Sequence, residues 1–447
     1  MEKYLRLYAE PELLALDGIP EQESWANVLV IPACNEAPGL LRPPPPSDGR
    51  SLMILVINES IDAACNVSLS NQALAAAVQK RFEPQWQSGT RFPGFELSFF
   101  RDPLAPRDVL LVDRYSEGRK LPAKGGVGHA RKIGADLATG LIYRKQITSP
   151  WIHCTDGDVH LPHTYFTCSN AVEDTSAKLS ALVYPFQHCA GRHGATSNEV
   201  LLATQLYELS LRYYVAGMKF ARSPYAFHTI GSTMAVRASH YTKVRGFPRR
   251  AAGEDFYLLN KLAKTGAVLE LEAGKGCDPI EIESRCSDRV PFGTGAAVNK
   301  ITAFSDPVAE FRFYDPAIFQ LLRLWLQALP TIWQSGSSEL TIDIFPDRIG
   351  QNGGQQVLLE SLKAMGTHKA LEHAFRQSKD GDQFAKQMHT WFDAFRTLKL
   401  IHALRDNQLP SISYQSLVAN QTFSLLLGQD LDLEACLNLT GPWQDVD

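Results

Sequence analysis

The stretch WIHCTDGDVHLP, residues 151–162, begins as an apolar strand and ends with two aspartates separated by one glycine. In an extended chain Asp156 and Asp158 point to the same face, and the small Gly157 between them lets backbone or a ligand come close. Two hard oxygen donors on one face suit Mg2+ or Mn2+, ions that also bind diphosphate oxygens. The simpler alternative is a turn after a strand, for which Asp-Gly is a common signal, and this motif alone leaves both interpretations open.

Short apolar runs bounded by turn residues recur around this stretch, and segments with helical spacing lie between several of them. Ala130, Ile133, Leu137 and Leu141 are three or four residues apart and predict one buried helical face. A second helix is predicted from Thr196, because Glu199 completes a capping-box pattern. Strands that alternate with helices indicate an α/β fold with a mainly parallel sheet flanked by helices. The predicted strands are residues 27–31, 52–57, 109–112, 151–154 and 179–184.

Beyond about residue 305 the strand-like runs largely disappear. Residues 316–329 are apolar almost all round and predict a buried helix, and the run Pro43–Pro46 predicts a stiff surface loop. We therefore expect an N-terminal segment (1–25), an α/β domain (26–305) and a C-terminal all-helical domain (306–447). One further helical stripe is predicted from Phe384, Met388, Trp391, Phe392, Phe395, Leu398 and His402.

Composition excludes several classes of protein. Among 447 residues 45% are hydrophobic and 21% charged, which argues against extensive disorder, and a net charge of -4 argues against a nucleic-acid partner. Eight cysteines without C-x-x-C spacing, and an N-terminus without a secretory pattern, predict reduced thiols and a cytoplasmic location. No window approaches the about 18 uninterrupted apolar residues of a membrane span. We therefore expect no transmembrane segment, and a lipid-linked substrate would be reached from the cytoplasmic side.

Softer ligands near the aspartates offer a rival metal site. Zinc would use the side chains of His153, Cys154, His160, His163 and Cys168. These spacings match no common structural zinc pattern, and neighbouring strand residues face opposite sides. Ordinary packing is the favoured interpretation of these five residues.

Three other stretches carry polar residues at the expected ends of elements. VIPACNE (30–36) closes the first strand at the carboxyl edge of the sheet, where ligands of α/β proteins bind. Glu254 and Asp255 open an amphipathic helix, for which simple capping is the alternative explanation. KGGVGHAR (124–131) satisfies neither the dinucleotide fingerprint nor the P-loop.

In this order, these pieces resemble a family 2 glycosyltransferase with a GT-A fold. The resemblance runs from VIPACNE through GVGHARKIGADLATG, DGD and IGSTMAVRASHYTKVRGF to GEDF, spans roughly residues 27–300, and does not extend to the C-terminal helices. It implies an inverting, metal-dependent transfer of sugar from a UDP- or GDP-linked donor to a hydroxyl acceptor, which is a carbohydrate, a lipid-linked molecule or a small molecule. The divalent cation would be Mn2+ or Mg2+.

The resemblance also implies residue roles. Asp255 would be the general base next to Glu254, and Asp158 would lie most directly on the metal, with Asp156 nearer the ribose or sugar. Arg285 and Arg289 would clamp the diphosphate from a closing loop. The donor pocket would further include Pro32, Ala33, Asn35, Glu36, Lys124 and Arg131.

The sequence departs from the family in two places. After the second strand, where an aspartate often reads the base, Asn58 or Glu59 must serve. No histidine occurs between His240 and His368 to complete a metal shell, so the third ligand would be Asp278, another acid or water. The C-terminal helices have three open roles: holding the acceptor, forming a homodimer interface, or bracing the catalytic domain.

Two alternatives compete with the transferase. A sugar-1-phosphate nucleotidylyltransferase should carry a phosphate loop rich in glycine and lysine after the first strand, where this chain has CNEAPGLL. A catalytically silent nucleotide-sugar-binding scaffold would have no need of the acids in DGD and GEDF, although only turnover excludes it.

Overall fold

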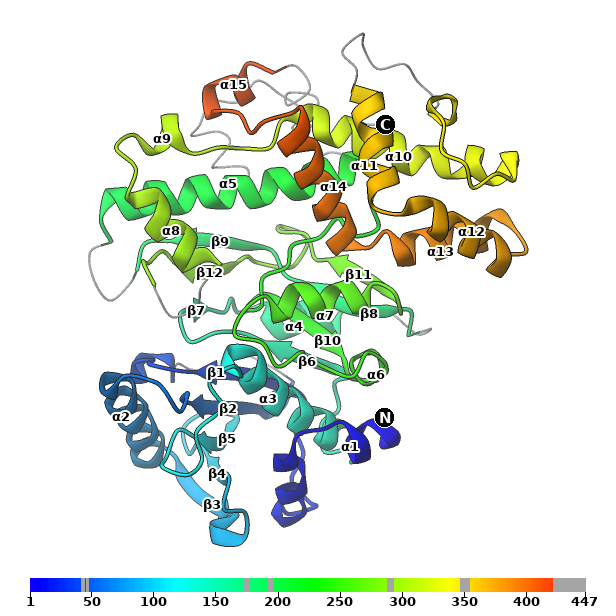
Figure 1. Ribbon diagram of the computed structural model, residues 1–447. Coiled ribbons are helices and arrows are strands. Elements are labelled where there is room, and N and C mark those ends of the chain that lie inside the picture. Colours follow the sequence, from blue (N-terminus) through cyan, green and yellow to red (C-terminus); the bar gives the residue numbers. More distant parts are fainter. Residues whose placement is uncertain are drawn as a thin grey trace. The chain divides into compact units, whose positions relative to one another are not determined.

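The computed structural model describes most of the chain, and it divides into two compact units (Figure 1). Unit 1 comprises Met1–Leu201 and Thr229–Val298, and unit 2 comprises Leu202–His228 together with the chain from Asn299 onward. Each unit therefore consists of two separate stretches of the chain. The domain boundaries predicted at residues 25 and 305 remain predictions. The described residues are 1–41, 45, 48–172, 177–191, 196–287, 293–345 and 354–420.

Unit 1 is built on one large sheet. Within the described residues, nine strands form it in the order β11-β8-β10-β6-β1-β2-β5-β4-β3. The pairs β5-β2-β1-β6 are all parallel, whereas β10 runs antiparallel between β6 and β8, and β4 antiparallel to β5 and β3. The strands are β1 (Asn27–Ala33), β2 (Ser51–Asn58), β3 (Glu83–Gln87), β4 (Glu96–Arg101), β5 (Arg107–Arg114), β6 (Trp151–Cys154), β8 (Leu179–Val183), β10 (Met234–Arg237) and β11 (Ala267–Glu270).

The central strands form because their sequences are continuously apolar. Every residue of β1 and β2 is buried, as expected for parallel strands that are covered on both faces. The sheet is parallel at its centre and flanked by helices, which confirms the predicted α/β class, although four of its eight strand pairs are antiparallel. All five predicted strands are present, with ends that differ by at most two residues.

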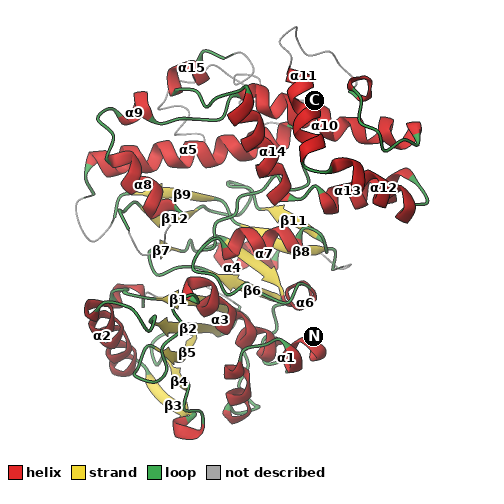
Figure 2. Cartoon of the chain, in the orientation of Figure 1, coloured by secondary structure: helices red, strands yellow, loops and turns green. Residues whose placement is uncertain are grey.

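Helices cover both faces of the sheet (Figure 2). On one face α3 (Gly126–Tyr143) approaches β1 so closely that a Cβ at Gly134 would lie 2.4 Å from Val30 Cγ1. On the other face α2 (Cys65–Arg81) and α4 (Tyr165–Asn170) share a core with β1 and β2. That core also takes in a three-stranded sheet of β7 (Val159–His160), β12 (Ile280–Glu283) and β9 (Phe186–Cys189).

Shorter helices complete the part of the chain up to residue 302. α7 contacts α3 and also the strands β8 and β11. These elements are α1 (Glu2–Leu7), η1 (Pro11–Gly18), η2 (Pro38–Leu40), η3 (Gly89–Arg91), α6 (Ala238–Lys243), α7 (Glu254–Leu262) and α8 (Thr294–Thr302).

The regular elements in the described part of unit 2 are helices, and an isolated bridge joins Phe313 to Ile412. The long α5 packs on α10 through Gly217, where a Cβ would lie 2.5 Å from the Phe319 ring. None of the helices in the described part of the chain combines the length and the apolar character that crossing a membrane requires. The elements are α5 (Asn198–Phe220), α9 (Pro307–Glu310), α10 (Pro316–Ser335), η4 (Ile342–Ile344), α11 (Gly354–Ala364), α12 (Thr367–Gln377), α13 (Gly381–Trp391), α14 (Ala394–Asn407) and α15 (Tyr414–Val418).

Two helix predictions were wrong in detail. The hydroxyl of Ser197, not Thr196, accepts from the first turn of α5, since it bonds the Val200 amide at 3.4 Å. The Thr196 hydroxyl instead accepts from the Gly191 amide at 2.8 Å. The stripe predicted over residues 384–402 is split into α13 and α14, because Asp393 starts a new helix by accepting from the Arg396 amide. Pro43, Pro44 and Pro46 lie outside the described residues.

Candidate functional site

The site lies where the connections of the parallel sheet change direction. From β1 the chain passes to β2 on one side, whereas β6 lies on the other side, and ligands of α/β sheets bind at such points. The β1–β6 ladder ends at the pair Val30 and Cys154, and Pro32 lies beyond it. A Cβ at Gly157 would lie 2.9 Å from Glu36 Cδ, so the CNE and DGD motifs meet at this edge.

Arg131 of α3 joins two of the expected acids. Its Nη2 lies 2.5 Å from Asp156 Oδ1, and its Nη1 donates to Glu254 Oε1. The arginine is 4% exposed, and a Cβ at Gly231 would overlap its guanidinium. Burial alone would lower the pKa of Arg131, but attraction to Asp156, Glu254 and Asp255 outweighs it and raises the pKa. The structure thus places a permanent cation between the DGD and GED motifs.

Glycines within residues 125–128 allow the start of α3 to lie close to residues 248–251. The Gly128 amide donates to the Arg250 carbonyl at 3.0 Å, and a Cβ at Gly128 would lie 2.7 Å from both the Arg250 and the Pro248 oxygens. At Gly126, with φ of +50°, a Cβ would lie 2.5 Å from Ala251 Cα. The glycine-rich run therefore permits backbone contact with the loop that leads to Glu254. Sequence reasoning compared this run with nucleotide loops and missed that role.

Asp255 lies in the first turn of α7, beside the buried Glu254. Its Oδ1 accepts from the Phe256 amide at 2.7 Å, and the side chain is half-buried. Burial first, and then repulsion from Glu254, raise the pKa of Asp255 to about 7, although Arg131 opposes the shift. Simple capping does not account for this environment, because the carboxyl group is held near a second acid. Its proton is therefore exchangeable near neutral pH.

Asp158 meets a second arginine. Arg285 Nη2 lies 2.5 Å from Asp158 Oδ2 and 3.4 Å from Glu36 Oε1, so this cation links the ends of β1 and β6. The Asp158 carbonyl also accepts from the Glu283 amide at 3.2 Å, which fixes the chain direction into β7. Arg285 follows β12 and is about one-third exposed. Arg289 lies outside the described residues.

The acids fit one mode of divalent-cation binding. Within the described residues, no group of three His, Cys, Asp or Glu side chains is placed to hold a metal ion. Asp278, expected as a third ligand, instead accepts from the Thr164 hydroxyl at 3.2 Å. Mg2+ is commonly held by one or two carboxylates together with substrate phosphates and water. Asp156 and Asp158 are two carboxylates of this kind, and each pairs with an arginine in this structure.

Two histidines of the zinc alternative have partners within the fold. His153 is fully buried, with Nδ1 3.0 Å from the Val28 carbonyl and Nε2 2.9 Å from Ser169 Oγ. Burial lowers the pKa of His153 to about 4, so it is a neutral link between β1 and α4. His160 lies 2.7 Å from Glu283 Oε1. The preference for ordinary packing over zinc is consistent with these contacts.

Several expected donor residues have structural partners. The Asn58 side-chain amide donates to the Ala33 carbonyl at 3.0 Å, and the buried Glu59 pairs with Lys120 at 2.7 Å. Both side chains thus bind neighbouring parts of the fold. Asn35 is exposed and has a φ of 56°, and its backbone N–H donates to Asn71 Oδ1.

The remaining expected residues differ in their distance from the acids. Pro32 and Ala33 are buried in β1, directly before the CNE turn. Lys124 is exposed in the turn before α3, and among the contacts of the described residues none joins it to the aspartates. The structure therefore brings together Glu36, Arg131, Asp156, Asp158, Glu254, Asp255 and Arg285, and not Lys124.

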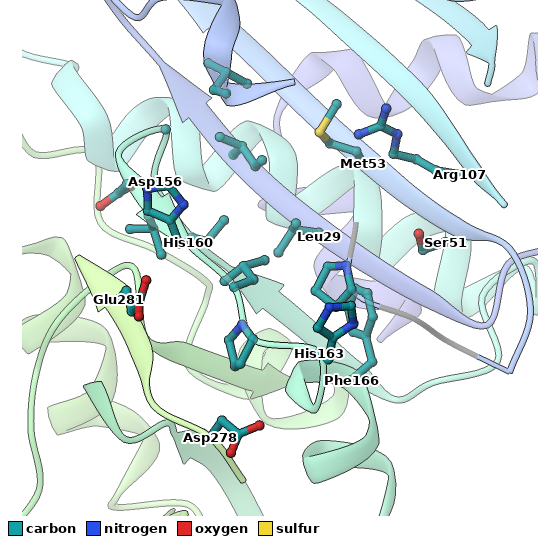
Figure 3. Close-up of a pocket in the computed structure, with 18 of the residues that line it drawn as sticks. Leu29, Ser51, Met53, Arg107, Asp156, His160, His163, Phe166, Asp278 and Glu281 are labelled. Carbon is teal, nitrogen blue, oxygen red and sulfur yellow. The ribbon is translucent and has the colours of Figure 1, made fainter. Parts of the chain in front are cut away.

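A cavity of about 500 Å3 opens beside Asp156 on the face of β1 and β2 that is opposite α3 (Figure 3). Figure 3 shows Asp156 and His160 at one end and Ser51 and Arg107 at the other. Its lining is apolar along β1 and polar at Ser51, Arg107 and Glu281. The buried Thr155 hydroxyl has no hydrogen-bond partner among the described residues. The apolar lining includes Leu29, Ile31, Met53, Leu161 and Phe166.

Likeness to known proteins is found at the level of structure. No protein-family model matches the chain, and no curated protein matches it. A mannosyltransferase from Pyrobaculum calidifontis, solved in complex with GDP-Man and Mn2+, is similar over 91% of this chain and 95% of its own, with 15% identity and a TM-score of 0.32. Values of this size do not establish a shared family, so a functional assignment depends on the geometry of the site.

Proposed function

We propose that this protein is an inverting, metal-dependent glycosyltransferase with a GT-A fold, similar to family 2, that moves a sugar from a nucleotide-diphosphate-sugar to a hydroxyl acceptor. One observation carries the proposal. Arg131 connects Asp156, at the carboxyl edge of the sheet, to Glu254 in the same turn as Asp255. The group that would bind the donor is thereby linked to the turn that carries the group that would accept a proton.

The donor would lie at the edge formed by β1 and β6. Asp156 and Asp158 would hold Mn2+ or Mg2+, which when bound supplies positive charge to the diphosphate. Arg285, already within 2.5 Å of Asp158, is placed to pair with phosphate oxygens once it exchanges partners. Negative charge builds on the leaving diphosphate during transfer, so fixed cations at this edge would lower the barrier.

Asp255 would act on the acceptor. A general base works best when its pKa lies near the working pH, and the pKa of Asp255 is raised to about 7. As the acceptor oxygen bonds to the sugar carbon, the bond from that carbon to the diphosphate oxygen breaks, and the hydroxyl proton passes to Asp255. Attack opposite the leaving group gives inversion at the sugar carbon.

The test is thermal unfolding with UDP, GDP and their common sugar conjugates, with and without Mn2+. A ligand at one hundred times its Kd adds about 2.7 kcal/mol to stability. We expect a metal-dependent increase in Tm with one nucleotide, its loss in Asp158→Asn, and its retention in Glu272→Gln, which replaces an exposed acid. Absence of a shift with every nucleotide would overturn the donor site. A nucleotide-specific shift without any transfer would favour a silent binding protein instead.

A further inference from the structure

Two buried cysteines outside the site lie on adjacent segments of the fold. Cys168 is in α4 and Cys277 lies shortly before β12, roughly 110 residues later. They are 7% and 4% exposed, belong to the same hydrophobic core, and are both free thiols. The Cys168 thiol donates to the carbonyl of Gly276, the residue before Cys277, at 3.3 Å. Thiols from distant parts of the sequence are therefore carried by segments that touch.

The backbone on either side of the sulfurs is already fixed. The Asp278 amide donates to Thr164 Oγ1 at 2.9 Å, and the same hydroxyl donates to Asp278 Oδ2 at 3.2 Å. The Cys168 thiol lies 3.3 Å from the Gly276 carbonyl, so α4 and the segment 276–278 are joined at three neighbouring positions. Disulfides need Cα atoms about 4.4–6.8 Å apart, a separation that only adjacent segments supply.

The two thiols differ in reactivity. The neighbouring Cys277 thiol is the largest influence on Cys168 and lowers its pKa, although burial opposes it, whereas Cys168 and burial raise the pKa of Cys277. The thiolate is the nucleophile in exchange, so Cys168 is the attacking sulfur and Cys277 the resolving one. By contrast, burial raises the pKa of the enclosed Cys154 to about 12.

We propose that Cys168 and Cys277 form a reversible intramolecular disulfide by exchange with a low-molecular-weight disulfide such as oxidised glutathione. The Cys168 thiolate attacks that disulfide and releases one glutathione thiolate, which takes up a proton. Cys277 then gives up its proton and attacks the Cys168 sulfur of the mixed disulfide, releasing the second glutathione. Two protein thiols are oxidised and one small disulfide is reduced to two thiols. This inference does not depend on the proposed glycosyl transfer.

The experiment exposes the native full-length protein to oxidised glutathione, traps free thiols by alkylation in acid, and maps peptides without reduction. We expect a peptide pair that joins Cys168 to Cys277, and its disappearance after dithiothreitol. Cys65, which is exposed, reports whether the reagent reached the protein. If Cys65 is glutathionylated while Cys168 and Cys277 remain alkylated, or if the link forms only in denaturant, the proposal is wrong.

Two serine variants separate attack from resolution. In Cys277→Ser the mixed disulfide of Cys168 with glutathione should accumulate, because no resolving thiol remains. In Cys168→Ser, Cys277 should stay largely unmodified over the same time. Equal modification of the remaining cysteine in both variants would contradict the assigned roles. The wild-type mapping remains decisive even where a variant does not fold.

Discussion

The guanidinium of Arg131 lies 2.5 Å from the Asp156 carboxylate and, through its other nitrogen, binds Glu254. One buried cation therefore compensates carboxylates that come from a strand end and from a helix start. Removing one partner of a buried ion pair leaves an uncompensated charge, which is far more costly than breaking an exposed pair. The same contact that assembles the site thus contributes to its stability.

Arg131→Ala should destabilise the protein by about 3–5 kcal/mol, because it leaves Asp156 and Glu254 without their cation. Urea unfolding measures the loss. Arg144→Ala is the matched control, since Arg144 and Asp17 form an exposed pair that should contribute only about 0–1 kcal/mol. Similar losses in both variants would show that Arg131 is not the central cation.

Asp255→Asn should lower transfer by about 10²–10⁴-fold, the usual contribution of a general base, while nucleotide binding stays nearly unchanged. Initial rates and nucleotide affinity, each compared with Glu272→Gln, measure the two effects. Parallel loss of binding and turnover would remove Asp255 from the role of base and place it in donor binding.

The pKa of Asp255 gives two pH dependences of opposite sense. Turnover should rise with pH through about 7, because the base must be ionised. The stability contribution has the reverse sign: the folded state holds the proton more tightly than the unfolded state, whose pKa is near 3.8, so stability falls as pH rises from about 4 to about 7. Thermal unfolding of wild type and Asp255→Asn across this window should show a steeper fall in wild type, because Glu12 and Asp136, whose pKa values burial also raises, titrate in both proteins. Identical pH profiles would contradict the raised pKa.

Gly128→Ala should destabilise the protein by about 1–3 kcal/mol, because its methyl group would lie 2.7 Å from two backbone oxygens that cannot move independently. It should also weaken activity, since α3 carries Arg131. Gly94→Ala is the control, with its nearest neighbour 3.9 Å away. If Gly128→Ala left the free energy of unfolding unchanged, the contact between α3 and residues 248–251 would have to relax freely.

The sequence predicted what local patterns determine. Continuous apolar runs predicted the five strands, and the residues after the first strand were predicted to lie at the carboxyl edge of the sheet, where ligands bind. The exact helix starts were not predicted. Thr196 and Ser197 are equally good caps by residue type, and the apolar stripe that continues across Phe392 hides the helix start at Asp393. The contacts of Asn58 and Gly128 depend on segments distant in sequence, which no local pattern reports.

Most of α5 lies between the two stretches of unit 1, and this affects the order in which the units can fold during synthesis. α5 leaves the ribosome about 100 residues before α10, and its Tyr213 and Gly217 pack on Phe319 of that later helix. At about 5–20 residues per second, α5 waits for several seconds with an unpaired apolar face. The two units are therefore completed in overlapping periods of synthesis. A chain that stops at residue 305 would retain α5 without its partner, and should need chaperones to avoid aggregation.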